Sequence, residues 1–153
     1  MFAAPALAPL ATGCAPTPAA EAAASRKTAA TSAQLAVPPK ELVERVKAAV
    51  AAPPLSVPVE TQEKGTLVTG WKPYRGDFHI AHYWQDRTRF RIEVVPDWDE
   101  PTARSKLTVL AETEQRSAEG QTWDREPRIP RPARAQEALK AILDNVERPA
   151  GHE

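Results

Sequence analysis

The stretch RTRFRIEVVP, residues 87–96, decides the fold. Its apolar and charged residues alternate, with Phe90, Ile92 and Val94 set against Arg89, Arg91 and Glu93. Successive side chains of a β-strand point to opposite faces, so this period of two predicts a strand with one buried face and one wet face. The apolar face of the resulting sheet must be covered by other elements.

Two further stretches predict neighbouring strands. KGTLVTGWKPY, residues 64–74, is rich in β-branched residues, and SKLTVLAETEQR, residues 105–116, again alternates apolar with polar side chains. If the last strand lies beside residues 87–96, the arginines of one can pair with the glutamates of the other. The residues concerned are Arg87, Arg89 and Arg91 on one strand, and Glu112 and Glu114 on the other.

A helix is predicted at each end of the strand region. PPKELVERVKAAVAA, residues 38–52, places Pro39 in a first turn and repeats apolar residues at helical spacing before Pro53 and Pro54. ARAQEALKAILDNVER, residues 133–148, carries one apolar stripe opposite Arg134 and other polar residues. We therefore expect an α+β fold. It would be a two-layer sandwich, in which an antiparallel sheet of three or four strands carries the N-terminal and the C-terminal helix on one face.

Composition limits the classes of partner. The 153 residues contain 20 basic and 20 acidic side chains, so no net positive field draws the chain to nucleic acid. The single cysteine, Cys14, cannot form an intramolecular disulfide, and no window is long and apolar enough for a spanning helix. Specific binding must come from local features.

The N-terminal residues predict where in the cell the protein is located. LATGC, residues 10–14, resembles the lipobox of a bacterial lipoprotein signal, with a polar Ala/Pro/Ser/Thr-rich stretch after the cysteine. The resemblance implies lipidation of Cys14 and an anchor at the periplasmic face of the outer membrane. We expect residues 1–14 to be the end of a signal that begins upstream. Residues 15–38 would be a flexible tether, 39–148 the domain and 149–153 a tail.

The domain resembles one helix-grip domain of the BamC (NlpB) lipoproteins, which belong to the outer-membrane β-barrel assembly machinery. The resemblance rests on the order of a helix, KGTLVTGW, RTRFRIEVV, SKLTVLAETEQR, Trp123 and a closing helix, over residues 40–147. It implies a single-domain, non-enzymatic relative that assists envelope assembly by binding envelope proteins, among them barrel-assembly components.

Tryptophan and arginine side chains are the candidate partner contacts, since both are enriched at interfaces. We expect Trp84 and Trp98, with Arg87, Arg89 and Arg91, to supply them, and Trp71 and Trp123 to complete the core. Read instead as a single-stranded nucleic-acid surface, the arginines and Trp84 would be opposed by the neighbouring glutamates.

The histidine pair and the acidic turn are better explained by a structural role than by metal binding or catalysis. His79 and His82 would point to opposite faces of an extended segment, and Asp97, Asp99 and Glu100 lie between prolines in a turn. No catalytic residue, metal site or cofactor is expected, and no nucleic-acid partner. The alternatives are a lipoprotein that assists lipopolysaccharide transport, and a small soluble ligand-binding domain or enzyme with a pocket between helices and sheet.

Overall fold

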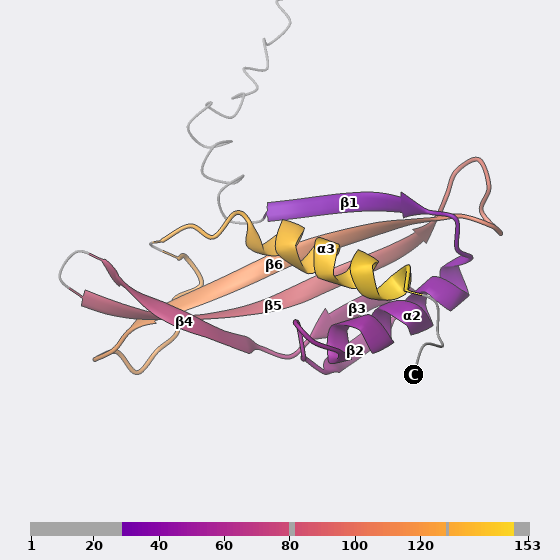
Figure 1. Ribbon diagram of the computed structural model, residues 1–153. Helices are drawn as coiled ribbons and strands as arrows, with labels where there is room; N and C mark the ends of the chain where they lie inside the picture. Colours follow the sequence, from indigo (N-terminus) through magenta and orange to yellow (C-terminus); the bar gives the residue numbers. More distant parts are fainter. Residues whose placement is uncertain (1–28, 80–81, 128, 149–153) are drawn as a thin grey trace, which may run out of the picture.

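The computed structural model describes residues 29–79, 82–127 and 129–148, which form six strands and two helices (Figure 1). In chain order these are β1 (Ala29–Leu35), α2 (Pro39–Ala51), β2 (Val59–Glu63), β3 (Thr66–Thr69), β4 (Lys72–His79), β5 (His82–Pro96), β6 (Ser105–Ser117) and α3 (Arg134–Val146). The strands form one antiparallel sheet in the order β1-β6-β5-β3-β2, and β4 pairs with β5 alongside β3.

The strand β5 is the spine of the sheet. Its 15 residues span about 50 Å at the usual rise per residue. One side pairs with β6 without interruption, from Trp84 opposite Ser117 to Pro96 opposite Ser105, and the other side pairs with β3 and β4. The strand predicted at residues 87–96 is confirmed and extends back to His82.

The predicted two-layer sandwich with three or four strands is wrong. The sheet has six strands, and β4 with the first half of β5 and the end of β6 continues beyond the helices as a twisted arm (Figure 1). The extra strands lack the apolar alternation that marks β5: β2 is almost wholly exposed, and β4 is interrupted by Pro73 and Gly76. Hydrogen bonding within the sheet, and not a buried face of their own, holds these segments extended.

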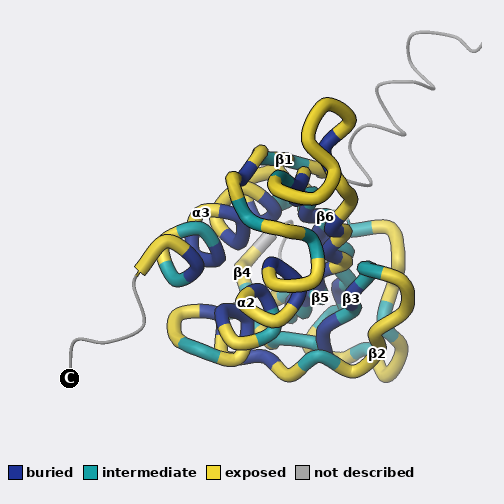
Figure 2. Tube along the Cα trace, turned by 90° about the vertical axis from the view of Figure 1, so that its right-hand side faces the viewer, coloured by how far each residue is buried: buried dark blue, intermediate teal, exposed yellow. Residues whose placement is uncertain are grey.

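Both helices lie on the same face of the sheet, and the core is formed between them and the central strands. Figure 2 shows the buried parts of α2, α3, β5 and β6 facing one another, with exposed residues on the outside. Each large apolar side chain buried here contributes about 1.5–3 kcal/mol. The fully buried apolar side chains include Leu42, Val46, Val50, Leu67, Phe90, Ile92, Leu107, Val109 and Ile142.

The two predicted helices are confirmed with nearly the expected bounds. Pro39 occupies the first turn of α2, where its missing N–H is not needed, and the helix ends before Pro53. The apolar stripe predicted on α3 is buried except for half-buried Leu143. One residue differs: Arg134, expected on the polar side, is buried at the start of α3.

Part of the predicted N-terminal tether forms an edge strand of the sheet. Residues 29–35 pair with β6 along their whole length, from Ala29 opposite Ala111 to Leu35 opposite Ser105. Leu35 is buried in the core, so β1 belongs to the folded domain, and the described part of that domain starts ten residues before the predicted boundary at 39 (39 − 29 = 10). The prediction of a flexible tether over 15–38 is wrong for this part. Cys14 and the rest of the predicted signal lie outside the described residues.

Candidate functional site

The open face of the sheet, opposite the helices, carries a row of stacked arginine and tryptophan side chains. The Arg87 guanidinium lies between the Trp71 and Trp123 rings, 4.5 and 4.3 Å from their centroids. Arg89 lies 4.8 Å from Trp71, and Arg116 lies 4.6 Å from Trp123. These distances are within the range of cation–π attraction, so the row holds the chain around Trp123 against the sheet.

The predicted pairing between β5 and β6 is confirmed for two of the three arginines. Arg87 donates from Nε to Glu114 Oε2 at 2.8 Å, and Arg89 donates from Nε to Glu112 Oε2 at 2.5 Å. Both pairs are partly exposed, so each contributes about 1 kcal/mol or less. Arg91 is exposed and lies opposite Leu110 in the register. Of the arginines expected to contact a partner, Arg87 and Arg89 therefore already serve the sheet itself.

The tryptophans are arranged differently from the prediction. Trp71 and Trp123, expected in the core, are only half-buried and stack on arginines of the open face. Trp84, expected as an exposed contact, is half-buried and makes contacts of its own within the fold. Trp98 is 96% exposed. It is the predicted contact residue that the fold leaves fully open to solvent.

Trp98 lies on a turn whose backbone is fixed from below. Asp97 is buried, and its Oδ1 accepts hydrogen bonds from the N–H groups of Asp99 at 2.9 Å and Glu100 at 3.3 Å. The Asp97 N–H donates to the Arg104 carbonyl at 3.0 Å, which closes the base of the turn. The predicted turn chemistry of Asp97 is thus confirmed, and it fixes the backbone on both sides of Trp98.

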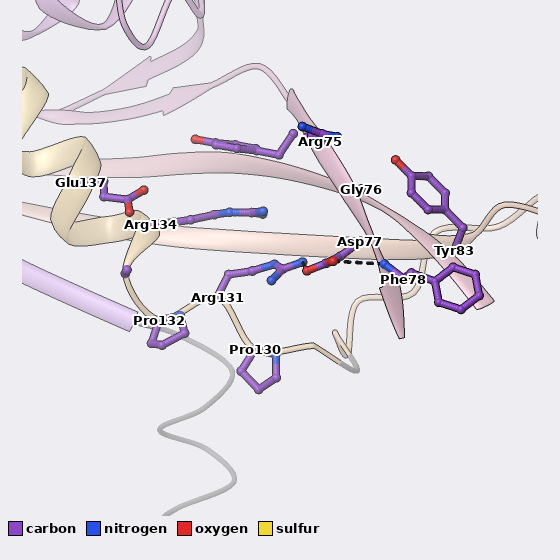
Figure 3. Close-up of a pocket in the computed structure, with 12 residues that line it drawn as sticks. Arg75, Gly76, Asp77, Phe78, Tyr83, Pro130, Arg131, Pro132, Arg134 and Glu137 are labelled. Carbon is purple, nitrogen blue, oxygen red and sulfur yellow. Dashed lines mark hydrogen bonds and ion pairs between the residues drawn. The ribbon is translucent and has the colours of Figure 1, made fainter. Parts of the chain in front are cut away.

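A cleft lies at the other end of the molecule, where the arm passes the segment before α3 (Figure 3). Its volume is about 780 Å³, in the range of small-molecule sites. Phe78 is 70% exposed and Tyr83 is exposed by 42%, so the cleft has an aromatic wall. The lining residues are Tyr74, Arg75, Gly76, Asp77, Phe78, Tyr83, Pro130, Arg131, Pro132, Ala133, Arg134 and Glu137.

A buried carboxylate organises the floor of this cleft. Asp86 is 1% exposed, and its Oδ2 accepts hydrogen bonds from Arg131 Nε at 2.8 Å and Arg134 Nη2 at 2.9 Å. Arg134 also donates to Thr88 Oγ1 at 2.6 Å, and its guanidinium lies 4.0 Å from the Tyr74 ring centroid. The two arginines are therefore held by the fold, and the start of α3 is fixed to β5 through them.

The electrostatics of the floor follow from burial and from these pairs. Burial raises the pKa of Tyr74 above its ordinary value of 10.0, with Arg134 acting in the opposite direction and Glu137 in the same one. Burial also lowers the pKa of Arg134, although Asp86 opposes this. For Arg131 burial lowers the pKa, but hydrogen bonds and charge from Asp86 and Asp77 outweigh it and raise the pKa.

Sequence reasoning missed this cluster, although the signal was there. Counting back by two from Phe90 puts Thr88 and Asp86 on the helix-facing side of β5. A charge on a buried face needs a partner, so a basic side chain was to be expected over Asp86, although the sequence does not show that the partners come from PRPAR, residues 130–134.

The remaining clusters do not gather into a site. His79 and His82 are partners in the register of β4 and β5, and Ile80 and Ala81 between them lie outside the described residues. Across the described ranges no three His, Cys, Asp or Glu side chains lie close enough together to hold a metal ion. Asp99 and Glu100 are exposed beside Trp98.

The cleft and the turn both offer contacts for another molecule. Aromatic faces, proline rings and guanidinium groups suit a peptide or protein surface better than bond-breaking chemistry. Neither helix in the described part of the chain is long and apolar enough to cross a membrane. No protein-family model and no curated protein matches the chain.

Proposed function

We propose that the protein is a lipid-anchored lipoprotein of the bacterial outer membrane, facing the periplasm, that assists envelope assembly by binding other proteins. The observation that carries the proposal is Trp98, 96% exposed on a turn whose backbone is fixed by Asp97. Tryptophan is enriched among the few residues that supply most of the binding energy of protein interfaces, and these residues cluster near the interface centre. Because hydrogen bonds already fix the backbone of the turn, binding loses little backbone conformational entropy.

The residues around Trp98 indicate what kind of partner surface would be complementary to the turn. The exposed carboxylates of Asp99 and Glu100 follow it directly, and Val95 is exposed nearby at the end of β5. An apolar pocket bordered by Lys or Arg would complement this turn. Components of the β-barrel assembly machinery are the candidate partners.

The predicted anchor and the turn are compatible in space. Cys14 and Ala29 are 29 − 14 = 15 residues apart, which allows a reach of up to about 50 Å. The turn follows Pro96, and Pro96 lies opposite Ser105, whose partner in β1 is Leu35. The turn is thus at the far end of β1 from the residue that leads to Cys14, so Trp98 can face away from the membrane.

Two measurements test the proposal. Cys14→Ala should abolish incorporation of labelled palmitate and move the protein out of the membrane fraction. A photo-crosslinking residue at position 98 should capture barrel-assembly components in intact envelopes, while the same residue at exposed Glu44 on α2 should not. Unchanged palmitate labelling in Cys14→Ala would refute the anchor, and equal capture from both positions would refute the role of Trp98.

A further inference from the structure

The three outer edges of the sheet differ in how well they are protected. A strand at an edge exposes unpaired N–H and C=O groups, and proteins usually block them with proline, charge or a bulge. On β4, Pro73 has no N–H, the register shifts between Tyr74 and Asp77, and the Phe78 N–H donates to Asp77 Oδ1 at 3.1 Å. This edge is blocked along its length.

The second edge, β2, is blocked by charge and irregularity. Its sequence is VETQE, in which Glu60 and Glu63 are exposed. Its register with β3 shifts between Val59 and Thr61. An acidic strand approaching this edge would be repelled by the two glutamates. A strand of any charge would meet a distorted backbone, with which it could not pair regularly.

The third edge, β1, has none of these devices. Its sequence, AATSAQL, contains no proline and no charged residue, and its register with β6 runs unbroken over all seven residues. Ala30, Ser32 and Gln34 are exposed. In the described part of the chain β6 is the partner of β1, and the opposite side of β1 pairs with no strand.

The hydrogen-bond pattern shows which backbone groups point outward. In β6 the Gln115 N–H points away from β5, because it donates to Asp124 O at 3.0 Å. Backbone groups alternate sides along a strand, and the β5–β6 register is unbroken, so Ala111, Val109 and Leu107 direct theirs to β1. Their partners in β1 are the odd-numbered residues. The outward N–H and C=O groups therefore belong to Ala30, Ser32 and Gln34.

A groove runs between β1 and α3, beside this edge. It has a volume of about 640 Å³ and is lined by Thr31 together with one side of α3. Leu139 and Leu143 give it an apolar base, while exposed Glu137, Asp144 and Glu147 outnumber Lys140 around it. A strand added to β1 would direct every second side chain toward this groove.

We propose that β1 is a docking edge for an extended segment of another protein, which joins the sheet as an additional antiparallel or parallel strand. The segment alternates apolar and polar residues, places its apolar residues over Leu139 and Leu143, and carries Lys or Arg toward the acidic rim. This goes beyond the proposed function, because it stands on the edge of the sheet and not on the anchor or on Trp98.

The charge of the rim also decides against a second copy of the chain. Two copies pairing through β1 about a two-fold axis would bring the two acidic rims to the same interface. Like charges facing each other across a partly buried surface oppose association. A basic, alternating segment has the complementary charge.

The test uses the full chain and a blocked synthetic peptide, KTVKLTVK, in which apolar and polar residues alternate. Titration followed by NMR should shift the amide signals of Ala30, Ser32 and Gln34, with cross-strand contacts between peptide and β1. The peptide KTTKVLVK has the same composition without the alternation and should bind at least tenfold more weakly. The counterpart with Glu in place of Lys should also bind more weakly.

Backbone methylation of the peptide provides a control that leaves the protein untouched. Methyl groups on one alternate set of peptide nitrogens should abolish binding, whereas methyl groups on the other set should not, because only one edge of the peptide faces β1. In the protein, Ser32→Pro removes an outward N–H and should weaken binding about tenfold, while Ser32→Ala should not. Asp144→Lys should weaken binding of the basic peptide.

Three results would overturn the proposal. Equal binding of the alternating and the rearranged peptides would mean that no strand is added. Protection of the Ala30, Ser32 and Gln34 amides from exchange in the free full chain would mean that the chain itself covers the edge. A dimer in sedimentation that Ser32→Pro dissociates would make a second copy the occupant.

Discussion

Asp86 lies four residues before Phe90 on the same face of β5, with Thr88 between them. Two arginines, one from the segment before α3 and one from its first turn, close over it. The carboxylate is fully buried, and Arg134 is nearly so. A buried charge without its partner is strongly unfavourable, whereas the complete cluster joins β5 to residues 131–134 at the start of α3.

Replacing Asp86 tests this dependence. Asp86→Asn keeps the size of the side chain but leaves buried Arg134 without its negative partner, and should lower the free energy of unfolding by about 3 kcal/mol. Urea unfolding monitored by circular dichroism measures the change. Asp99→Asn, at an exposed position, is the control and should change stability by about 0.5 kcal/mol or less. Equal stability of the two variants would show that the cluster is not structurally important.

Burial of Tyr74 makes the stability of the folded protein depend on pH. Burial raises its pKa in the folded chain above the ordinary 10.0, so the folded protein retains the hydroxyl proton where the unfolded chain loses it. The contribution of Tyr74 is complete below pH 10.0 and is lost as the pH rises through the folded pKa. Urea midpoints should therefore fall more steeply above pH 10 in the wild type than in Tyr74→Phe. Parallel curves would contradict the raised pKa.

Among the elements, those that bury a regular apolar pattern were predictable from the sequence. The alternation in β5 and β6 and the stripe on α3 each contain several large apolar residues, so hydrophobic burial and local periodicity agree. AATSAQL in β1 has Leu35 as its one large apolar residue, and its extended conformation depends on β6, which follows much later in the chain. No local pattern could reveal that pairing.

The alternation of backbone groups in β1 can be tested by moving a proline by one residue. Ala33→Pro removes an N–H directed at β6, and should lower the free energy of unfolding by about 3 kcal/mol. Ser32→Pro, whose N–H points outward, should have a much smaller effect. Thermal unfolding of the two variants makes the comparison. A larger loss in Ser32→Pro would reverse the assignment of the outward groups.

At the scale of the whole molecule, the helix-covered half and the arm are built on different chemistry. An apolar core fills the first, whereas the arm depends on the Asp86 cluster and on the arginine and tryptophan stacking of the open face. The helix-covered half could be predicted from the sequence because regularly spaced hydrophobic residues indicate a buried face. The polar contacts depend on pairs such as Asp86 and Arg134, which are 48 residues apart, and sequence spacing does not identify them.

Because β5 and β6 run through both halves, we expect the molecule to unfold as one unit. Helix content, measured by far-ultraviolet circular dichroism, reports on α2 and α3. Tryptophan fluorescence is weighted toward the arm by Trp71, Trp84 and Trp123. The two signals should give the same urea midpoint. Earlier loss of the fluorescence signal would show that the arm opens independently.

The pairing of β1 with β6 also determines when β1 can fold during synthesis of the chain. Ala29 and its partner Ala111 are separated by 111 − 29 = 82 positions, so β1 can pair only after β6, much later in the chain, has been synthesised. Contacts between such distant residues slow folding, because a long loop must close before they form. During that interval the bare segment AATSAQL and the matching side of β6 are both unpaired. A nascent chain of this protein therefore needs protection from unwanted strand pairing until residue 111 and its neighbours have emerged.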